Sequence, residues 1–217
     1  MASKKKDDTK ATATVQIKAP RIDALEFRIR GTAPYMQARF SAKSAQAMAV
    51  KMAAGSTAKR GNRKARDFED DCEQAKHVAT DGWNGIPAGA FRAAMISACR
   101  LVGFKMTLAK LSVYVRAEGF DRVDAVPLIR IYGEPKLDLR HTRNATGVVD
   151  LRARPLWLDW SSKPVVEYDA DQFTAEDVTN LVWRVGLQVG IGEGRPDSRS
   201  SAGMGFGTFR VEEVKGK

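Results

Sequence analysis

The carboxyl-terminal part of the chain reads Gly190-Ile191-Gly192-Glu193-Gly194-Arg195 and closes as Gly203-Met204-Gly205-Phe206-Gly207. Six glycines and two arginines, Arg195 and Arg199, therefore separate a helical pattern from a final apolar strand. Glycine adopts positive φ and lets backbone approach a bulky ligand, so this glycine loop (residues 190–207) is expected to expose amides to a ligand. The interleaved arginines indicate that the ligand is anionic.

The segment before the glycine loop predicts a helix. Thr174 is a good N-cap with Asp177 three positions later, and Phe173 stands where it can pack on Val178. Apolar residues recur at helical spacing: Val178, Leu181, Val182, Val185 and Val189. We therefore expect this helix to pack on a sheet and the glycine loop to lead into a strand over residues 206–214.

The upstream sequence predicts one more helix and several strands. Leu25 to Arg30 alternates apolar and charged residues, as a half-exposed strand does, and the apolar positions after Gly85-Ile86-Pro87 recur at helical spacing until Gly103. Further strands are expected at 111–115 and 128–132, with a strand pair at 156–160 and 164–168. This order is the βαββαβ order of the ferredoxin-like, RRM-like fold, so the predicted class is α+β.

The remaining segments are expected outside that core. Residues 1–21 are rich in lysine and poor in large apolar side chains, which predicts a flexible basic tail. A single domain is expected over 22–214, with an insertion at about 41–81 and a polar, turn-rich excursion at about 121–154.

The composition favours an anionic partner. The chain has 217 residues, a formal net charge of +10 and 43% hydrophobic residues, enough for a sizeable core. No apolar stretch reaches the roughly 18 residues of a membrane span, and no signal-peptide core is evident, so we expect a cytosolic protein without a membrane partner. The two cysteines and two histidines, Cys72, Cys99, His77 and His141, lack zinc-site spacing. No metal or cofactor is expected.

Two stretches together resemble the repeat-associated (RAMP) proteins of CRISPR effector complexes. Gly85-Ile86-Pro87-Ala88-Gly89-Ala90-Phe91-Arg92 resembles the opening of their first helix, and Gly190 to Phe209 resembles their glycine-rich loop and last strand. The resemblance implies an RRM-like domain that binds RNA. In the backbone subunits it further implies stacking along a guide RNA and a thumb, which would fall in the excursion. This chain departs from the family pattern at Ile96, where a family arginine would stand.

The resemblance and the charge pattern nominate nucleic-acid contacts. Those implied by the resemblance are Arg92, Gly192, Gly194, Arg195, Gly203 and Gly205. Those suggested by charge or by an aromatic ring are Arg140, His141, Arg143, Arg199, Phe206, Lys59, Arg60, Arg63 and Lys64. The basic residues of the insertion and the excursion are equally compatible with solvated loops. Tyr35 and Trp83 are also placed to stack on bases, whereas Trp157, Trp160 and Trp183 are expected in the core.

The sequence favours a protein that binds single-stranded RNA, a guide RNA among the candidates, as a homo-oligomer or within a ribonucleoprotein. One alternative is a metal-independent endoribonuclease of the same superfamily. The resemblance implies either a histidine general base, for which His141 is the candidate, or an aspartate that positions the scissile phosphate, for which the candidates are Asp121, Asp124, Asp138 and Asp150. The other is a self-assembling or partner-blocking protein that uses the fold for protein contacts.

Overall fold

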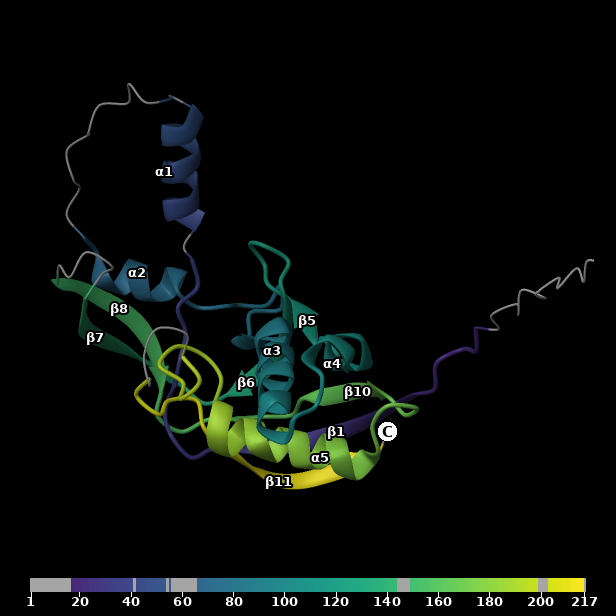
Figure 1. The fold of residues 1–217 in the computed structure, drawn as a ribbon. Coiled ribbons are helices and arrows are strands. Elements are labelled where there is room, and N and C mark those ends of the chain that lie inside the picture. Colours follow the sequence, from purple (N-terminus) through teal and green to yellow (C-terminus); the bar gives the residue numbers. More distant parts are fainter. Residues whose placement is uncertain are drawn as a thin grey trace, which may run out of the picture.

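The computed structural model describes residues 17–40, 42–53, 55, 66–143, 149–198 and 203–216 (Figure 1). Its strands are β1 (Ile22–Gly31), β2 (Tyr35–Met36), β3 (Gly85–Pro87), β4 (Val113–Val115), β5 (Gly119–Phe120), β6 (Pro127–Tyr132), β7 (Pro135–Arg143), β8 (Val149–Trp157), β9 (Ser161–Ser162), β10 (Val165–Asp169) and β11 (Phe209–Gly216). Its helices are α1 (Ala42–Ala53), α2 (Phe68–Gln74), α3 (Ala88–Ala98), α4 (Met106–Ser112) and α5 (Ala175–Arg184), with a 3-10 turn η2 (Cys99–Val102) and a π-helical turn η3 (Val185–Val189).

The main sheet is antiparallel and centres on β1. Strands β11, β1, β10 and β4 lie side by side in that order, and β9, β6 and β3 extend the sheet past the end of β10. A second, smaller sheet has the order β2, β8, β7. Helices combined with antiparallel sheets confirm the predicted α+β class.

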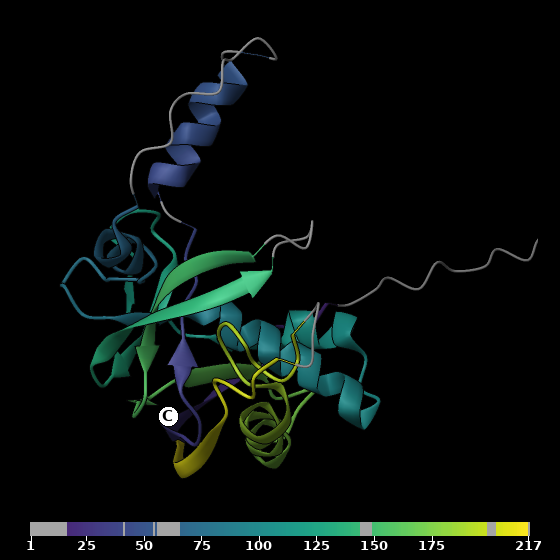
Figure 2. The same cartoon turned by 90° about the vertical axis from the view of Figure 1, so that its left-hand side faces the viewer.

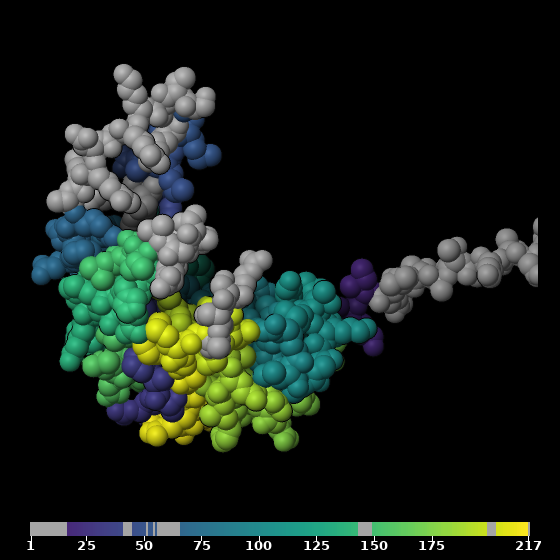
Figure 3. Space-filling model, turned by 60° about the vertical axis from the view of Figure 1, so that its left-hand side comes forward, coloured from purple at the N-terminus to yellow at the C-terminus, as the bar shows by residue number. Residues whose placement is uncertain are grey.

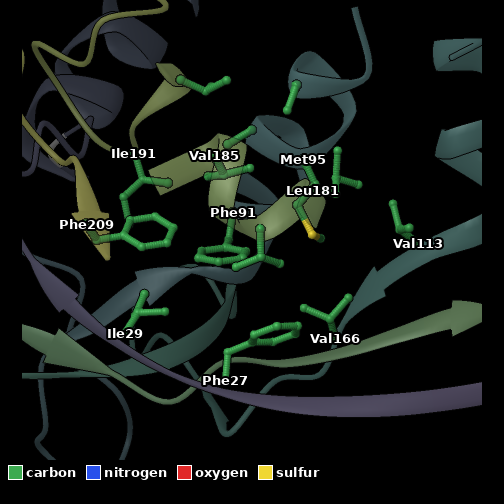
Figure 4. Close-up of a cluster of buried hydrophobic side chains, with 14 of the residues drawn as sticks. Phe27, Ile29, Phe91, Met95, Val113, Val166, Leu181, Val185, Ile191 and Phe209 are labelled. Atoms are coloured by element: carbon green, nitrogen blue, oxygen red, sulfur yellow. The ribbon is translucent and has the colours of Figure 1, made fainter. Parts of the chain in front are cut away.

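The alternation in β1 decides which face of the main sheet is buried. Leu25, Phe27 and Ile29 are buried, whereas Arg28 and Arg30 on the opposite face are exposed. Helices α3 and α5 cover the apolar face, so that Phe91 and Leu181 lie over Phe27 (Figure 4). The buried face of the sheet and these two helices form one core.

Helix α5 has the caps and the apolar face that its sequence predicts. The Thr174 hydroxyl accepts from the Asp177 amide at 3.1 Å, and the Asp177 carboxylate accepts from the Thr174 amide at 2.9 Å. All five residues of the predicted apolar stripe are buried. Trp183 lies off this stripe and is 52% exposed, so its predicted place in the core is wrong.

The predicted pairing of residues 156–160 with 164–168 is wrong. Strand β8 pairs with β7 and β2, whereas β10 pairs with β1 and β4. The buried Trp160 between them donates its indole N–H to the Ala33 carbonyl at 2.8 Å, which holds this connection against the end of β1 rather than in a hairpin. Leu111 and Ser112 likewise belong to α4 and not to the expected strand.

The hairpin of β7 and β8 and helix α1 extend from the body of the protein (Figures 1 and 2). The hairpin falls in the expected excursion except for the last three residues of β8, and α1 and α2 lie within the expected insertion. None of the helices in the described ranges is long and apolar enough to span a membrane.

Candidate nucleic-acid interface

A groove crosses the surface where the start of α3 meets the glycine loop. Its first hollow, of about 360 Å³, lies between residues 35–39, His77 and the glycine loop. Its second hollow, of about 830 Å³, lies between α3, α4 and the same loop. Ala90, Gly192 and Arg195 line both hollows, so the two are adjacent, and together they are called the groove. On the face in Figure 3 the yellow glycine loop lies between the green β7–β8 hairpin and the teal α3–α4 segment.

Helix α3 presents its amino terminus at this groove. It begins directly after Pro87, which provides no side-chain cap, and its first turn contains no acidic residue. The first backbone N–H groups of a helix have no partner inside the helix, and the helix dipole is positive at this end. Because Gly89 and Ala90 are exposed, an anion in the groove can reach this terminus.

Two cations of the groove are available for an anionic ligand. Arg195 is half-buried and donates from Nη1 to the Gly192 carbonyl at 3.0 Å, and Lys110 is exposed at the rim of the second hollow. Neither is paired with a carboxylate within the described ranges of the chain. The charge of Arg195 contributes to the lowered pKa of Asp197, so the positive charge of the groove is only partly offset within the described part of the protein.

The carboxylates that line the groove, in contrast, already have hydrogen-bond partners within the protein. Asp197 accepts from Arg100 Nη2 at 2.8 Å and from the Ser97 hydroxyl. The Ser97 hydrogen bond and then the Arg100 contacts lower the pKa of Asp197. Glu193 accepts from Arg154 Nε at 2.8 Å. Each acidic group that would repel a phosphate is therefore balanced by its own arginine.

The glycine loop is held by its own backbone. The Gly207 amide donates to the Pro34 carbonyl at 2.7 Å, the Ile191 amide to Gly207 at 3.1 Å, and the Glu193 amide to Met36 at 2.9 Å. A Cβ atom on Gly207 would lie 1.7 Å from the Ile191 carbonyl oxygen. These amides are thus used inside the protein, and the glycine at 207 is required by packing of the loop on itself rather than by approach of a ligand.

The β7–β8 hairpin contacts the glycine loop through arginines of one face. Arg140 is held by Asp138 at 2.8 and 3.0 Å, and its guanidinium lies over the Phe206 ring, 5.0 Å from the centroid. The hydrogen bond to Asp138 raises the pKa of Arg140. The structure therefore brings the predicted residues Arg140 and Phe206 together, beside the groove.

His141 lies on the other face of the hairpin. His141 is exposed opposite Leu151 in the strand register, and Arg143 ends β7 opposite Val149. His141 has no hydrogen-bond partner among the described residues. The remaining predicted contacts Lys59, Arg60, Arg63, Lys64 and Arg199 lie outside the described residues.

Arg92 does not line either hollow of the groove. Its Nε donates to the Val113 carbonyl at 2.8 Å, Nη2 donates to the Lys110 carbonyl, and the guanidinium lies 4.9 Å from the centroid of the Tyr114 ring. These contacts tie the end of α4 and the start of β4 to α3. Within the structure, Arg92 therefore stabilises packing, whereas the family resemblance implies contact with RNA.

We expect Arg92→Ala to lower the stability of the fold rather than its affinity for nucleic acid. Loss of two hydrogen bonds from a charged donor should cost about 2 kcal/mol of unfolding free energy, with less than about a twofold change in RNA affinity. Urea unfolding and fluorescence anisotropy check this, with Arg184→Ala on α5 as the control. A tenfold loss of affinity at unchanged stability would instead identify Arg92 as an RNA contact.

Two aromatic predictions have different outcomes. Tyr35 is only 1% exposed and packs against Trp157 and Trp160, so its predicted role in stacking on bases is wrong. Burial raises the pKa of its hydroxyl, despite a hydrogen bond from Gln37. Trp83 is half-buried, and the Arg130 guanidinium lies over its ring, 4.9 Å from the centroid. Its role in stacking on bases stays a prediction.

A polar cluster at the edge of the first hollow escaped the sequence analysis. His77 Nδ1 lies 2.9 Å from Asp121 Oδ2, and the His77 amide donates to Gln37 Oε1 at 3.0 Å. Arg39 lies 3.6 Å from Asp121 and 3.2 Å from Asp124. Because His77 and Asp121 are 44 positions apart in the sequence, no local motif indicates the pair.

The same cluster is the one group of possible metal ligands in the described ranges. His77, Asp121 and Asp124 each offer an atom within 4.8 Å of the others. However, the Arg39 guanidinium already neutralises both carboxylates at short distance. Burial raises the pKa of Asp121. The hydrogen bonds from Val123 and His77 and the charge of Arg39 together lower it by more, so the net pKa lies below its usual value. An arginine in this position favours an ion-pair network over a bound cation.

No protein-family model and no curated protein sequence matches the chain. Among solved structures, the fold is similar to one chain of the cryo-EM structure of the Type III-B Cmr-beta bound to cognate target RNA. The two chains are 10% identical with a TM-score of 0.44. The similarity covers 90% of the present chain and 60% of the other.

Proposed function

We propose that this protein binds single-stranded RNA in the groove between α3, α4 and the glycine loop. The observation that carries the proposal is the pair of cations Arg195 and Lys110, without carboxylate partners in the described residues, beside the uncapped start of α3. A phosphate group can contact the cationic side chains and accept hydrogen bonds from the N–H groups at the start of the helix at the same time. The formal net charge of +10 acts in the same direction over a longer range.

The shape of the groove favours a single strand. Hollows of about 360 and 830 Å³ accommodate nucleotides side by side, whereas a duplex presents its phosphates on a convex surface. Phe206, already stacked under Arg140, provides an aromatic surface beside the groove. Bases can stack on such a ring without sequence preference.

The proposal includes the ferredoxin-like core that the sequence predicts. The strand order β11, β1, β10, β4, with α3 between β1 and β4 and α5 between β10 and β11 in the chain, supports this topology. We further propose that the β7–β8 hairpin is the thumb of a RAMP-type domain. By that resemblance the protein would be an RNA-binding subunit of a CRISPR-type ribonucleoprotein in the cytosol.

We further propose that copies of the protein assemble along the RNA strand. The support for this assembly is an apolar strip on the β7–β8 hairpin, where Leu137, Leu139, Val149 and Leu151 share a face by register and are 41–58% exposed. The same strip favours the alternative of a protein that acts by self-assembly. Mass photometry with and without RNA separates the two, because assembly on a strand requires RNA.

Binding is tested by fluorescence anisotropy with labelled single-stranded RNA, single-stranded DNA and double-stranded RNA of the same mixed sequence. We expect the single-stranded RNA to bind most tightly, with an affinity that falls steeply as salt increases. A preference for single-stranded DNA would support binding in the groove but would show that the ligand is DNA and not RNA. Absence of binding to all three at about 50 mM salt would contradict the proposed function.

A further inference from the structure

Strand β11 forms an edge of the main sheet. Its one partner among the described strands is β1, and Figure 1 shows it at the lower border of the molecule, beneath α5. An edge strand has a row of backbone N–H and C=O groups that point away from the sheet without a partner strand. Such a row can form hydrogen bonds with an extended polypeptide that is added to the sheet.

Exposed apolar side chains lie next to this edge. Trp183 of α5 and Leu187 of η3 are 52% and 67% exposed. They line a small hollow of about 80 Å³ together with three residues of β11, namely Phe209, Arg210 and Val211. Apolar side chains that gather on a surface mark sites of interaction, and a large aromatic residue beside a hollow is typical of a binding hot spot.

The hollow and the strand edge are fixed relative to each other. A Cβ atom on Gly186 would lie 2.3 Å from the Phe209 carbonyl oxygen, so the backbone of η3 packs directly on the start of β11. Val214 continues the apolar surface along the strand, because it lies opposite the buried Phe27 in the register and is itself 38% exposed. The surface is therefore formed before a partner binds, and ordering it costs no further free energy.

The charges of β11 favour a polypeptide over a nucleic acid at this surface. The strand has two basic and two acidic side chains, and these pair with each other, Arg210 with Glu212 at 3.2 Å and Lys215 with Glu213 at 3.1 Å. The strand is thus neutral in a chain with a formal net charge of +10. No residue of the small hollow lines the groove. A phosphate chain would therefore meet no excess positive charge here, whereas a peptide can use both the backbone edge and the hollow.

We propose that β11 binds an extended segment of a different protein, which adds a strand to the main sheet and places one side chain in the hollow beside Trp183 and Leu187. Hydrogen bonds to the backbone of β11 supply affinity, and the hollow supplies specificity for that one side chain. The hollow of about 80 Å³ is roughly half the size of a 150 Å³ cavity that holds benzene, so the side chain is aliphatic rather than aromatic. Because the surface is separate from the groove, this segment and RNA can be bound at the same time.

The test selects binders from random octapeptides displayed on phage, with the full-length protein as the target, and measures the selected peptides in synthetic form by fluorescence anisotropy. We expect peptides in which aliphatic and polar residues alternate. Leu187→Asp should weaken their binding by about tenfold or more, because a carboxylate then faces the aliphatic side chain. Leu111→Asp is the matched control, since Leu111 on α4 is 71% exposed and does not line the hollow, and it should change the affinity by less than about twofold.

Two further measurements use only the wild-type protein. N-methylation of alternate backbone amides of a selected peptide should abolish its binding in one of the two alternations, and the bound peptide should slow hydrogen exchange of the amides at 209–216. Tolerance of both N-methylated peptides, unchanged exchange at 209–216, or competition between peptide and RNA would overturn the proposal.

The remaining outcomes concern other occupants of the edge. Failure to select any peptide, or equal binding of the selected peptides to wild type and Leu187→Asp, would overturn strand addition at β11. Dimers that mass photometry detects for wild type without RNA, and that Leu187→Asp dissociates, would assign the edge to a second copy and overturn the proposal of a different protein. None of these results bears on RNA binding in the groove, so the proposed function is tested independently.

Discussion

Replacement of Gly207 by alanine is expected to disrupt the glycine loop and to abolish most RNA binding. The new Cβ would lie 1.7 Å from the Ile191 carbonyl oxygen, and the backbone at 207 has a φ of +69°. The steric conflict involves backbone on both sides, so no side chain can move to relieve it. We expect a loss of about 3 kcal/mol or more of unfolding free energy. This corresponds to a decrease of about 6–12 °C in Tm.

The loss of RNA affinity follows from the position of the loop. The hydrogen bond from Gly207 to Pro34 and the one from Ile191 to Gly207 hold the segment that carries Arg195 against the body of the protein. Displacement of this segment should weaken RNA binding by about tenfold or more. Differential scanning fluorimetry and anisotropy measure the two effects.

Gly205 provides the control for this experiment. Its φ is +75°, but a Cβ there would meet no atom within 4 Å. Gly205→Ala should therefore cost only the strain of the left-handed conformation, about 1–2 kcal/mol. Equal effects of the two substitutions would mean that φ alone, and not the contact with Ile191, makes glycine necessary at 207.

Reversal of the charge at Arg195 is expected to have the largest effect on binding with the least effect on the fold. Arg195 lines both hollows, and among the described residues its side chain donates one hydrogen bond, to the Gly192 carbonyl. Arg195→Glu should weaken RNA binding by about tenfold to a hundredfold at low salt and lower the salt slope by about one or more. The unfolding free energy should change by about 1 kcal/mol or less.

Arg28→Glu changes the net charge by the same amount on the opposite face of the sheet. Arg28 is exposed there and lies 3.7 Å from Glu213, away from the groove. Its reversal should weaken RNA binding only through the net charge of the protein, by about threefold or less. If the two reversals weaken binding equally, the groove has no special role and RNA is attracted by the charge of the whole protein.

The contrast between Arg195 and Arg92 shows what a basic residue in the sequence can indicate. Both are predicted RNA contacts, but Arg195 lines the groove and Arg92 donates to the carbonyls of Lys110 and Val113. The direction in which an arginine points depends on which element lies beside it. A strand was expected at 111–115 and no helix before it, whereas helix α4 covers Met106–Ser112, so the Lys110 carbonyl at its end was not anticipated as an acceptor.

The errors in strand pairing have the same cause, because the partner of a strand also depends on which elements pack beside it. Of the two runs expected as strands, 156–160 is strand only at Leu156 and Trp157, the end of β8, whereas 164–168 lies almost wholly in β10, and each strand pairs with a distant partner. Trp160 packs against Gly31, where a Cβ would lie 2.2 Å from the indole nitrogen. Gly31 and Trp160 are far apart in the sequence, and the hydrophobic pattern at 156–168 does not indicate their contact.

By itself the sequence determined the features that depend on near neighbours. The Thr174 and Asp177 caps, the buried stripe of α5, the end of η2 at Gly103 and the alternation of β1 involve residues a few positions apart. Their free energies are decided by local backbone geometry and by the periodicity of apolar residues. These features were sufficient to predict the α+β class.

Only the tertiary structure decided which side chains share the groove. It brings Arg195 of the glycine loop to the start of α3, and it pairs His77 with Asp121 across 44 positions. It also uses the loop amides for contacts to Pro34 and Met36, although the glycine pattern predicts amides exposed to a ligand. Each of these contacts depends on how the elements pack, because packing brings together groups that no sequence spacing relates.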